Sequence, residues 1–198
     1  MIIKIDQLLD EKEELILKDF LNCKEVEVYT SKVIYEEEDC FHLFSPSEIV
    51  IKINNRIVKI SDFSLWQSVE FSSHHINILY IDKIPLDFTL HSKIIHSIDQ
   101  VNIYKLEDFE VYNSPEVIQK FLPLPGMIDA SKECILNYST IAFLEFKSNS
   151  QFVFGIEVND GWDDSSIAFH KSEPTVQRFK KIMNKDFLAI SIYKTLQS

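Results

Sequence analysis

The sequence predicts a single α+β domain over residues 1–198, built mainly on antiparallel sheet. Three observations predict this class. Several short segments rich in β-branched residues alternate apolar and polar positions, as strands do. Turn residues separate two pairs of these segments, which is typical of β-hairpins. Other segments space their apolar residues as one face of a helix does, and no linker or low-complexity stretch divides the chain.

The first predicted helix covers residues 6–22. Its apolar residues fall on one seam, formed by Ile5, Leu9, Ile16 and Phe20. Asp10 and Glu13 have the spacing of a capping box, which would start the helix later than residue 6. Asn22 is the predicted stop, because asparagine tolerates the backbone conformation that commonly follows a helix.

Strands are predicted after this helix. Residues 25–37 alternate and are rich in β-branched side chains, so they indicate a strand. Residues 47–63 predict a hairpin, in which Asn54 and Asn55 supply positive φ at the turn. Residues 76–84 predict a further strand, which ends at a proline.

The next segment, residues 87–99, predicts a short helix. Its apolar residues Leu90, Ile94 and Ile98 recur every four positions. Residues 101–112 then return to strand-like alternation.

The second half of the chain repeats this mixture. The predicted elements are a short middle helix at 114–122, a hairpin at 139–158, a strand at 166–170, a C-terminal helix at 173–185 and a strand at 187–195. The hairpin units near 49–66 and 141–162 each lead to an acidic position and a tryptophan. This echo suggests a weak internal duplication, although two ordinary hairpins would produce the same pattern.

Composition excludes several classes of function. A formal net charge of −11 disfavours nucleic-acid binding and docking on anionic membranes, and it favours a basic protein partner. Three widely spaced glycines cannot form a glycine-rich phosphate loop, so no nucleotide cofactor is expected. An odd number of cysteines without a CxxC motif, no signal-peptide pattern and no long apolar run together predict a cytosolic protein.

Two patterns suggest a catalytic or metal site. Cys40 and His42 have a ligand-like spacing, but no second ligand motif accompanies them, so no metal and no catalytic residue is expected. Glu145 and Lys147, with Asp129 before them, resemble the PD-(D/E)xK nuclease pattern. That resemblance implies a metal-dependent nuclease or hydrolase, which is the alternative function.

The favoured site is a partner-binding surface. Two segments, "EEEDCFHLF" and "VNDGWDDSS", place carboxylates beside aromatic side chains. Aromatic side chains anchor interfaces, and carboxylates steer basic partners toward a surface. The predicted binding residues are Trp162, Asp160, Asp163, Asp164, Glu36, Glu37, Glu38 and Asp39.

In general character the chain resembles immunity proteins that neutralise polymorphic or contact-dependent bacterial toxins. The features shared are size, acidity, the α+β hairpin pattern and acidic segments such as "YEEED" and "NDGWDD". The resemblance implies binding to a basic toxin domain so that its active site or substrate groove is blocked. A self-associating regulatory or scaffold subunit is a further alternative, because a mainly antiparallel sheet leaves strand edges unpaired.

Overall fold

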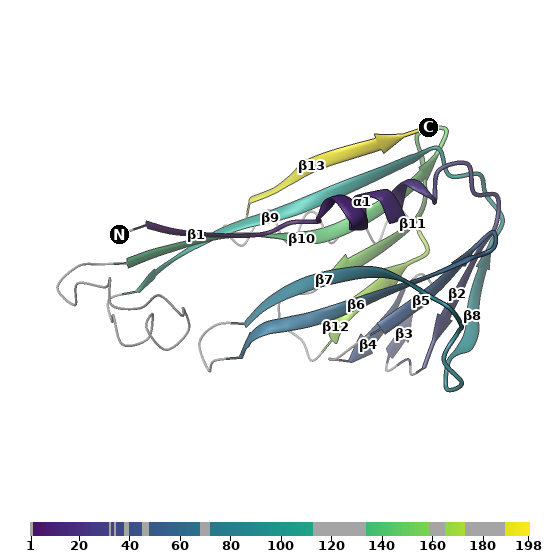
Figure 1. The fold of residues 1–198 in the computed structure, drawn as a ribbon, viewed down its shortest axis with the longest axis horizontal. Coiled ribbons are helices and arrows are strands. Elements are labelled where there is room, and N and C mark those ends of the chain that lie inside the picture. The colour runs from purple at the N-terminus through teal and green to yellow at the C-terminus, as the bar shows by residue number, and fades with distance from the viewer. Residues whose placement is uncertain are drawn as a thin grey trace.

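The fold is mainly β, with two sheets and a short helix. In the computed structural model of the protein, residues 2–31, 33, 35–37, 40–44, 48–67, 72–112, 134–158, 165–172 and 189–198 are described. They form thirteen strands and one helix, so the predicted α+β class is wrong for this part of the chain. Apolar side chains from both sheets and from the helix form one core cluster. The arrangement of the two sheets and the helix is drawn in Figure 1.

The larger sheet has the strand order β13-β9-β10-β11-β12-β4-β3, with β1 paired to β10 off this path. Its strands are β1 (Ile2–Gln7), β3 (Tyr35–Glu37), β4 (Cys40–Phe44), β9 (Gln100–Tyr112), β10 (Cys134–Ser148), β11 (Gln151–Val158), β12 (Ser165–His170) and β13 (Ala189–Gln197). The β1–β10 pair is parallel and covers residues 135–140 of β10, whereas β11 pairs with residues 143–148. Two short strands therefore accompany successive parts of one long strand.

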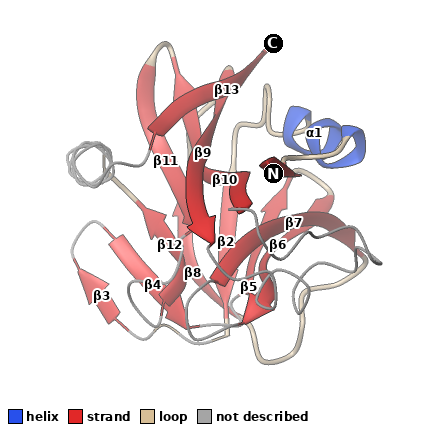
Figure 2. Ribbon diagram, turned by 90° about the vertical axis from the view of Figure 1, so that its left-hand side faces the viewer, coloured by secondary structure: helices blue, strands red, loops and turns tan. Residues whose placement is uncertain are grey.

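The smaller sheet is antiparallel and has the order β7-β6-β5-β2-β8. Its strands are β2 (Val26–Thr30), β5 (Glu48–Ile53), β6 (Arg56–Gln67), β7 (Ser72–Ile81) and β8 (Thr89–Ile94). β7 and β8 are the terminal strands of this order. Figure 2 shows this sheet curving beneath the larger one, with α1 at one side.

Both predicted hairpins are confirmed. β5 and β6 are joined at Asn54, whose φ is 50°, and β10 and β11 are joined at Asn149 and Ser150, with φ of 49° and 65°. Positive φ at these positions suits the right-handed twist of a two-residue hairpin turn. The two hairpins belong to different sheets, and internal duplication of the units near 49–66 and 141–162 stays a prediction.

The N-terminal helix is present but shorter than predicted. α1 spans Glu11–Lys18. The first two residues of the predicted helix, 6 and 7, instead belong to strand β1, which begins at residue 2. The capping box is confirmed, because Asp10 Oδ1 accepts from the Glu13 amide at 2.8 Å and Glu13 Oε2 accepts from the Asp10 amide at 3.0 Å. Asn22 has a φ of 65°, in agreement with its predicted role after the helix.

The predicted helix at 87–99 is wrong, because this segment contains strand β8. A spacing of four positions is also a multiple of two, so it places residues on one face of a strand as well as on one face of a helix. Pairing with β2 decides the outcome: Lys93 lies opposite Glu27, and Ile94 opposite Val26. The predicted middle helix at 114–122 and C-terminal helix at 173–185 lie outside the described residues.

A row of aromatic side chains crosses the core on the inner face of the larger sheet. The row begins at Phe20 beyond α1 and continues through Phe146, Phe154, Phe169 and Phe41 on four neighbouring strands. Successive ring centroids lie 4.9, 4.2, 5.4 and 5.0 Å apart. Such pairs stabilise a fold by about 0.5–1.5 kcal/mol each beyond the area that they bury.

Candidate functional site

Most of the predicted binding residues lie outside the described part of the chain. These residues are Glu38, Asp39, Asp160, Trp162, Asp163 and Asp164. Glu37 belongs to β3, but its side chain is not described. Their role in partner binding therefore stays a prediction.

Glu36 is exposed and lies beside two nitrogen-bearing side chains. Its Oε1 atom lies 3.1 Å from Lys171 Nζ and 3.3 Å from His91 Nε2. The hydrogen bond from Lys171 lowers the pKa of the Glu36 carboxyl. His91 comes from β8 and Lys171 follows β12, so this contact joins the edge of the smaller sheet to the larger one. Much of the Glu36 charge is thus compensated within the chain.

The two described residues of the nuclease hypothesis lie on β10. The Glu145 side chain is only 3% exposed, and its Oε2 atom accepts hydrogen bonds of 2.8 Å from Asn102 Nδ2 and from Tyr104 Oη. Burial, and then the hydrogen bond to Glu145, raises the pKa of Tyr104, so its phenol remains a donor. Asp129 lies outside the described residues. Asn102 and Tyr104 are neutral side chains on β9.

These groups belong to a buried polar row on the face of the larger sheet that points away from the core cluster. Asn102 Oδ1 also accepts from Gln100 at 2.8 Å and from Thr195 at 2.9 Å. Farther along the row, His170 Nε2 lies 2.6 Å from Glu157 Oε2, and both side chains are buried. Buried polar groups need such partners, so the row accounts for how these strands are held in register. Among the described residues, no group of three or more His, Cys, Asp or Glu side chains is placed to hold a metal ion.

A candidate site among the described residues is a groove between α1 and β7, which we call the α1–β7 groove. It has a volume of about 580 Å³. Its lining residues are Leu8, Asp10, Lys12, Glu13, Leu15, Ile16, Asn77, Ile78, Leu79 and Tyr80. Leu15 is 59% exposed and Tyr80 is 42% exposed, so the groove presents two large apolar side chains to solvent.

Polar contacts join α1 to both sheets. Glu13 Oε1 accepts from the Ile78 amide of β7 at 3.0 Å. Glu14 forms an ion pair with Lys194 of β13 in the larger sheet. The neighbouring carboxylates of Glu13 and Glu14 therefore connect α1 to β7 and to β13, which are terminal strands in the strand orders of the two sheets.

Tyr80 lines the groove and contacts Asp19 and Arg56, which lie outside its lining. Asp19 accepts hydrogen bonds from Arg56 and from the Tyr80 hydroxyl. The Arg56 guanidinium lies 5.4 Å from the centroid of the Tyr80 ring. Burial, followed by the hydrogen bond to Asp19, raises the pKa of Tyr80. The tyrosine ring is thereby fixed in place, which lowers the entropy cost of using it as a contact surface.

Negative charge surrounds the helix side of the groove. Residues 10–19 contain five carboxylates and two lysines. The carboxylates are Asp10, Glu11, Glu13, Glu14 and Asp19. A cationic partner would meet an attractive field here, because carboxylates near a surface steer oppositely charged groups.

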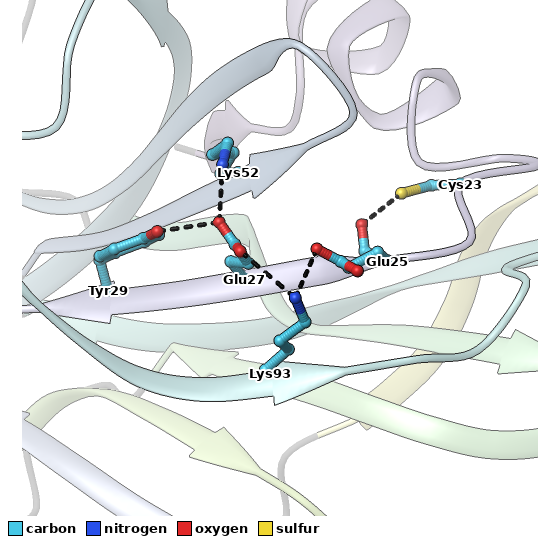
Figure 3. A network of polar contacts seen from close by, with 6 residues as sticks. All are labelled: Cys23, Glu25, Glu27, Tyr29, Lys52 and Lys93. Carbon is cyan, nitrogen blue, oxygen red and sulfur yellow. Dashed lines mark hydrogen bonds and ion pairs between the residues drawn. The ribbon is translucent and has the colours of Figure 1, made fainter.

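The outer face of the smaller sheet has a different arrangement of charge (Figure 3). Glu27 on β2 lies opposite Lys52 on β5 and Lys93 on β8. Its carboxylate oxygens are 2.9 Å from Lys52 Nζ and 3.7 Å from Lys93 Nζ, and Lys93 also reaches Glu25 at 2.8 Å. The hydrogen bond from Lys52, and then that from Tyr29, lowers the pKa of Glu27. Opposite charges alternate on this face.

Sequence reasoning missed the α1–β7 groove. The signal available was Leu15, an apolar residue that lies off the predicted seam of the N-terminal helix. The position of Tyr80 beside it depends on how the helix meets a strand about sixty residues later, which no local pattern encodes.

No helix among the described residues is long and apolar enough to cross a membrane. Comparison of the chain with protein-family models, with curated proteins and with solved structures gives no match.

Proposed function

We propose that this protein is a non-catalytic binding protein that holds a basic protein partner in the α1–β7 groove. The observation that carries the proposal is the pairing of two exposed apolar side chains, Leu15 and Tyr80, with the carboxylates of residues 10–19. Interfaces commonly combine a few aromatic or aliphatic anchors with a polar rim. The groove has both parts in one place.

Charge and rigidity support this proposal. The chain carries a formal net charge of −11, so a basic partner approaches it favourably from many directions. α1 is bonded to β7 through Glu13 and to β13 through Glu14, so little ordering of the site would be needed on binding.

The narrower form of the proposal is that the protein is a cytosolic immunity protein and that its partner is a toxin domain. This form rests on the resemblance in size and acidity stated above. An immunity protein would cover the active site or the substrate groove of the toxin. Co-expression with a toxin encoded beside its gene tests this form, since the wild-type chain should restore growth.

The test of the proposal is partner capture with matched variants. Purified wild type, Leu15→Asp and Leu90→Asp are immobilised and exposed to extract of the native host, and the retained proteins are identified and quantified. Leu90 is 52% exposed on β8, at the opposite edge of the smaller sheet from β7, so its variant adds the same charge outside the groove.

The proposal expects a basic protein that wild type and Leu90→Asp retain and that Leu15→Asp loses. Circular dichroism of all three chains must first show the same folded state. Equal retention of every basic protein by Leu15→Asp and wild type would overturn the assignment of the groove.

A further inference from the structure

We propose that the partner enters the α1–β7 groove as an extended segment that pairs with the edge of β7. This inference rests on the proposed function and names the form of the partner. The segment would be cationic, with apolar side chains at alternate positions. Addition of a strand to an exposed sheet edge is a general mode of peptide recognition, in which main-chain hydrogen bonds supply much of the affinity.

The first argument is the position of β7. In the order β7-β6-β5-β2-β8, β7 has a strand neighbour on one side only. Its register with β6 places Ile78 opposite Ile60 and Tyr80 opposite Val58. The outer edge of β7 borders the groove along Asn77–Tyr80, so an incoming strand would have access to backbone groups there.

The second argument is the direction of those backbone groups. The Ile78 amide donates to Glu13 Oε1, so it points away from β6 and into the groove. In an antiparallel pair, alternate residues point their amide and carbonyl to the same side. The amide and carbonyl of Tyr80 therefore point outward as well, as does the carbonyl of Ile78.

Glu13 limits how far a partner segment could form backbone hydrogen bonds along β7. Its carboxylate already occupies the Ile78 amide, whereas the outward groups of Tyr80 lie beyond its reach along the strand. A partner segment would exchange two hydrogen bonds with Tyr80 and donate one to the Ile78 carbonyl. The geometry thus points to a short ladder, and side-chain contacts must supply the remaining affinity.

Those side-chain contacts match a segment that alternates apolar and basic residues. Successive side chains of a strand point to opposite faces, so one set can pack on Leu15 and Tyr80. The other set points away from Leu15 and Tyr80, and its basic side chains would be attracted at longer range by the carboxylates of residues 10–19. A helix or a compact loop could use the same side chains, but it would leave the backbone of Tyr80 unpaired.

The test uses a defined peptide and amide-resolved NMR on the full chain. The probe is a capped six-residue peptide of alternating lysine and valine. Two control peptides have the same sequence. One is N-methylated at its odd-numbered residues and the other at its even-numbered residues, so each has one strand edge that cannot donate hydrogen bonds. Titration of ¹⁵N-labelled wild type gives the affinities, and hydrogen exchange gives the protection of the Tyr80 amide.

Strand addition predicts that the unmodified peptide shifts the Tyr80 amide resonance and slows its exchange by at least about tenfold at saturation. One of the two N-methylated peptides should bind about tenfold more weakly, because it cannot pair with β7. Glu107→Gln, which removes an exposed carboxylate on β9 of the larger sheet, should leave this difference unchanged.

Equal binding of all three peptides, or no binding at millimolar concentration, would overturn strand addition. A second contradicting result would be a homodimer, detected by sedimentation equilibrium, in which the Tyr80 amide is protected without peptide. The β7 edge would then pair with a second copy of this chain. Loss of partner capture in Leu15→Asp combined with equal peptide binding would leave the proposed function standing and remove only the strand. Unchanged capture in Leu15→Asp would instead remove the proposed function.

Discussion

Glu13 is the residue on which the groove most depends. One oxygen closes the capping box with Asp10, and the other accepts the buried amide of Ile78. Truncation to alanine removes one of the two hydrogen bonds of the capping box and leaves a buried donor without its acceptor. These two losses cost about 1 kcal/mol and about 1–3 kcal/mol respectively.

We therefore expect Glu13→Ala to lower the free energy of unfolding by about 2–4 kcal/mol in urea titrations. Glu11→Ala is the matched control, because Glu11 also lies in the first turn of α1 but is exposed. The control should change stability by less than about 0.5 kcal/mol. Equal midpoints for the two variants would show that the Glu13 contacts do not support the fold.

Gly155 shows how tightly the polar face of the larger sheet is packed. A Cβ atom at this position would lie 2.2 Å from Cζ and 2.8 Å from Cε2 of Phe143. Phe143 is fully buried, so its ring has little room to move. Forcing an extra methyl group into such a site costs about 1–3 kcal/mol.

Gly155→Ala should accordingly destabilise the chain by about 1–3 kcal/mol in thermal or urea unfolding. The same change made in a Phe143→Leu background should cost clearly less, because leucine lacks the ring atoms that clash. A double-mutant cycle measures the difference. An identical cost in both backgrounds would contradict the proposed clash.

At the scale of single residues, the sequence is informative only where partners are close along the chain. The capping box was predictable because Asp10 and Glu13 are three residues apart. The neighbours of Glu145 were not, since Asn102 and Tyr104 precede it by about forty residues. A charged residue between apolar ones on a strand suggests an exposed face, and the structure instead buries this carboxylate with neutral donors.

At the scale of elements, local pattern predicted the hairpins well and failed for β8. Hairpins are recognised by alternation on either side of a turn, and both signals lie within about twenty residues. For β8 the spacing of Leu90, Ile94 and Ile98 suits a helix and a strand equally. Pairing with β2, more than fifty residues earlier, makes the segment a strand. The contacts of Glu36 show the same limit, because its partners come from β8 and from the end of β12, and its role in partner binding stays a prediction.

The cross-strand pairs of β2 predict a pH dependence. The pKa of Glu27 is lower in the folded chain than its ordinary value of about 4.3, because Lys52 donates to its carboxylate. Its stabilising contribution is therefore fully present above about pH 4.3 and is lost as the pH falls through the lower, folded-state pKa.

Glu27→Gln should lower the urea midpoint of unfolding at pH 7. The difference in midpoint between this variant and wild type should shrink as the pH falls below about 4.3. Glu48→Gln is the control, since Glu48 pairs with Lys59 in the same sheet and its loss changes the net charge equally. A difference between Glu27→Gln and wild type that stays constant down to pH 3 would contradict the assignment.

At the scale of the whole molecule, the sequence predicted antiparallel pairing but not how the strands are distributed between two sheets. The order β12-β4 in the larger sheet joins residues about 130 positions apart, and β1 lies parallel to β10 across a similar separation. Apolar alternation indicates that a strand has a buried face without indicating which strand it lies beside. The groove is a product of this long-range arrangement, because it forms where an early helix meets the terminal strand of the smaller sheet.

The central claim is that the α1–β7 groove, rather than the segment around Trp162, holds the partner. The most direct test is the dissociation rate of the captured basic protein from immobilised wild type, Leu15→Ala and Trp162→Ala, measured by biolayer interferometry at two salt concentrations. The account predicts dissociation at least about tenfold faster from Leu15→Ala, with association that slows as salt is raised. Unchanged dissociation from Leu15→Ala together with faster dissociation from Trp162→Ala would contradict it.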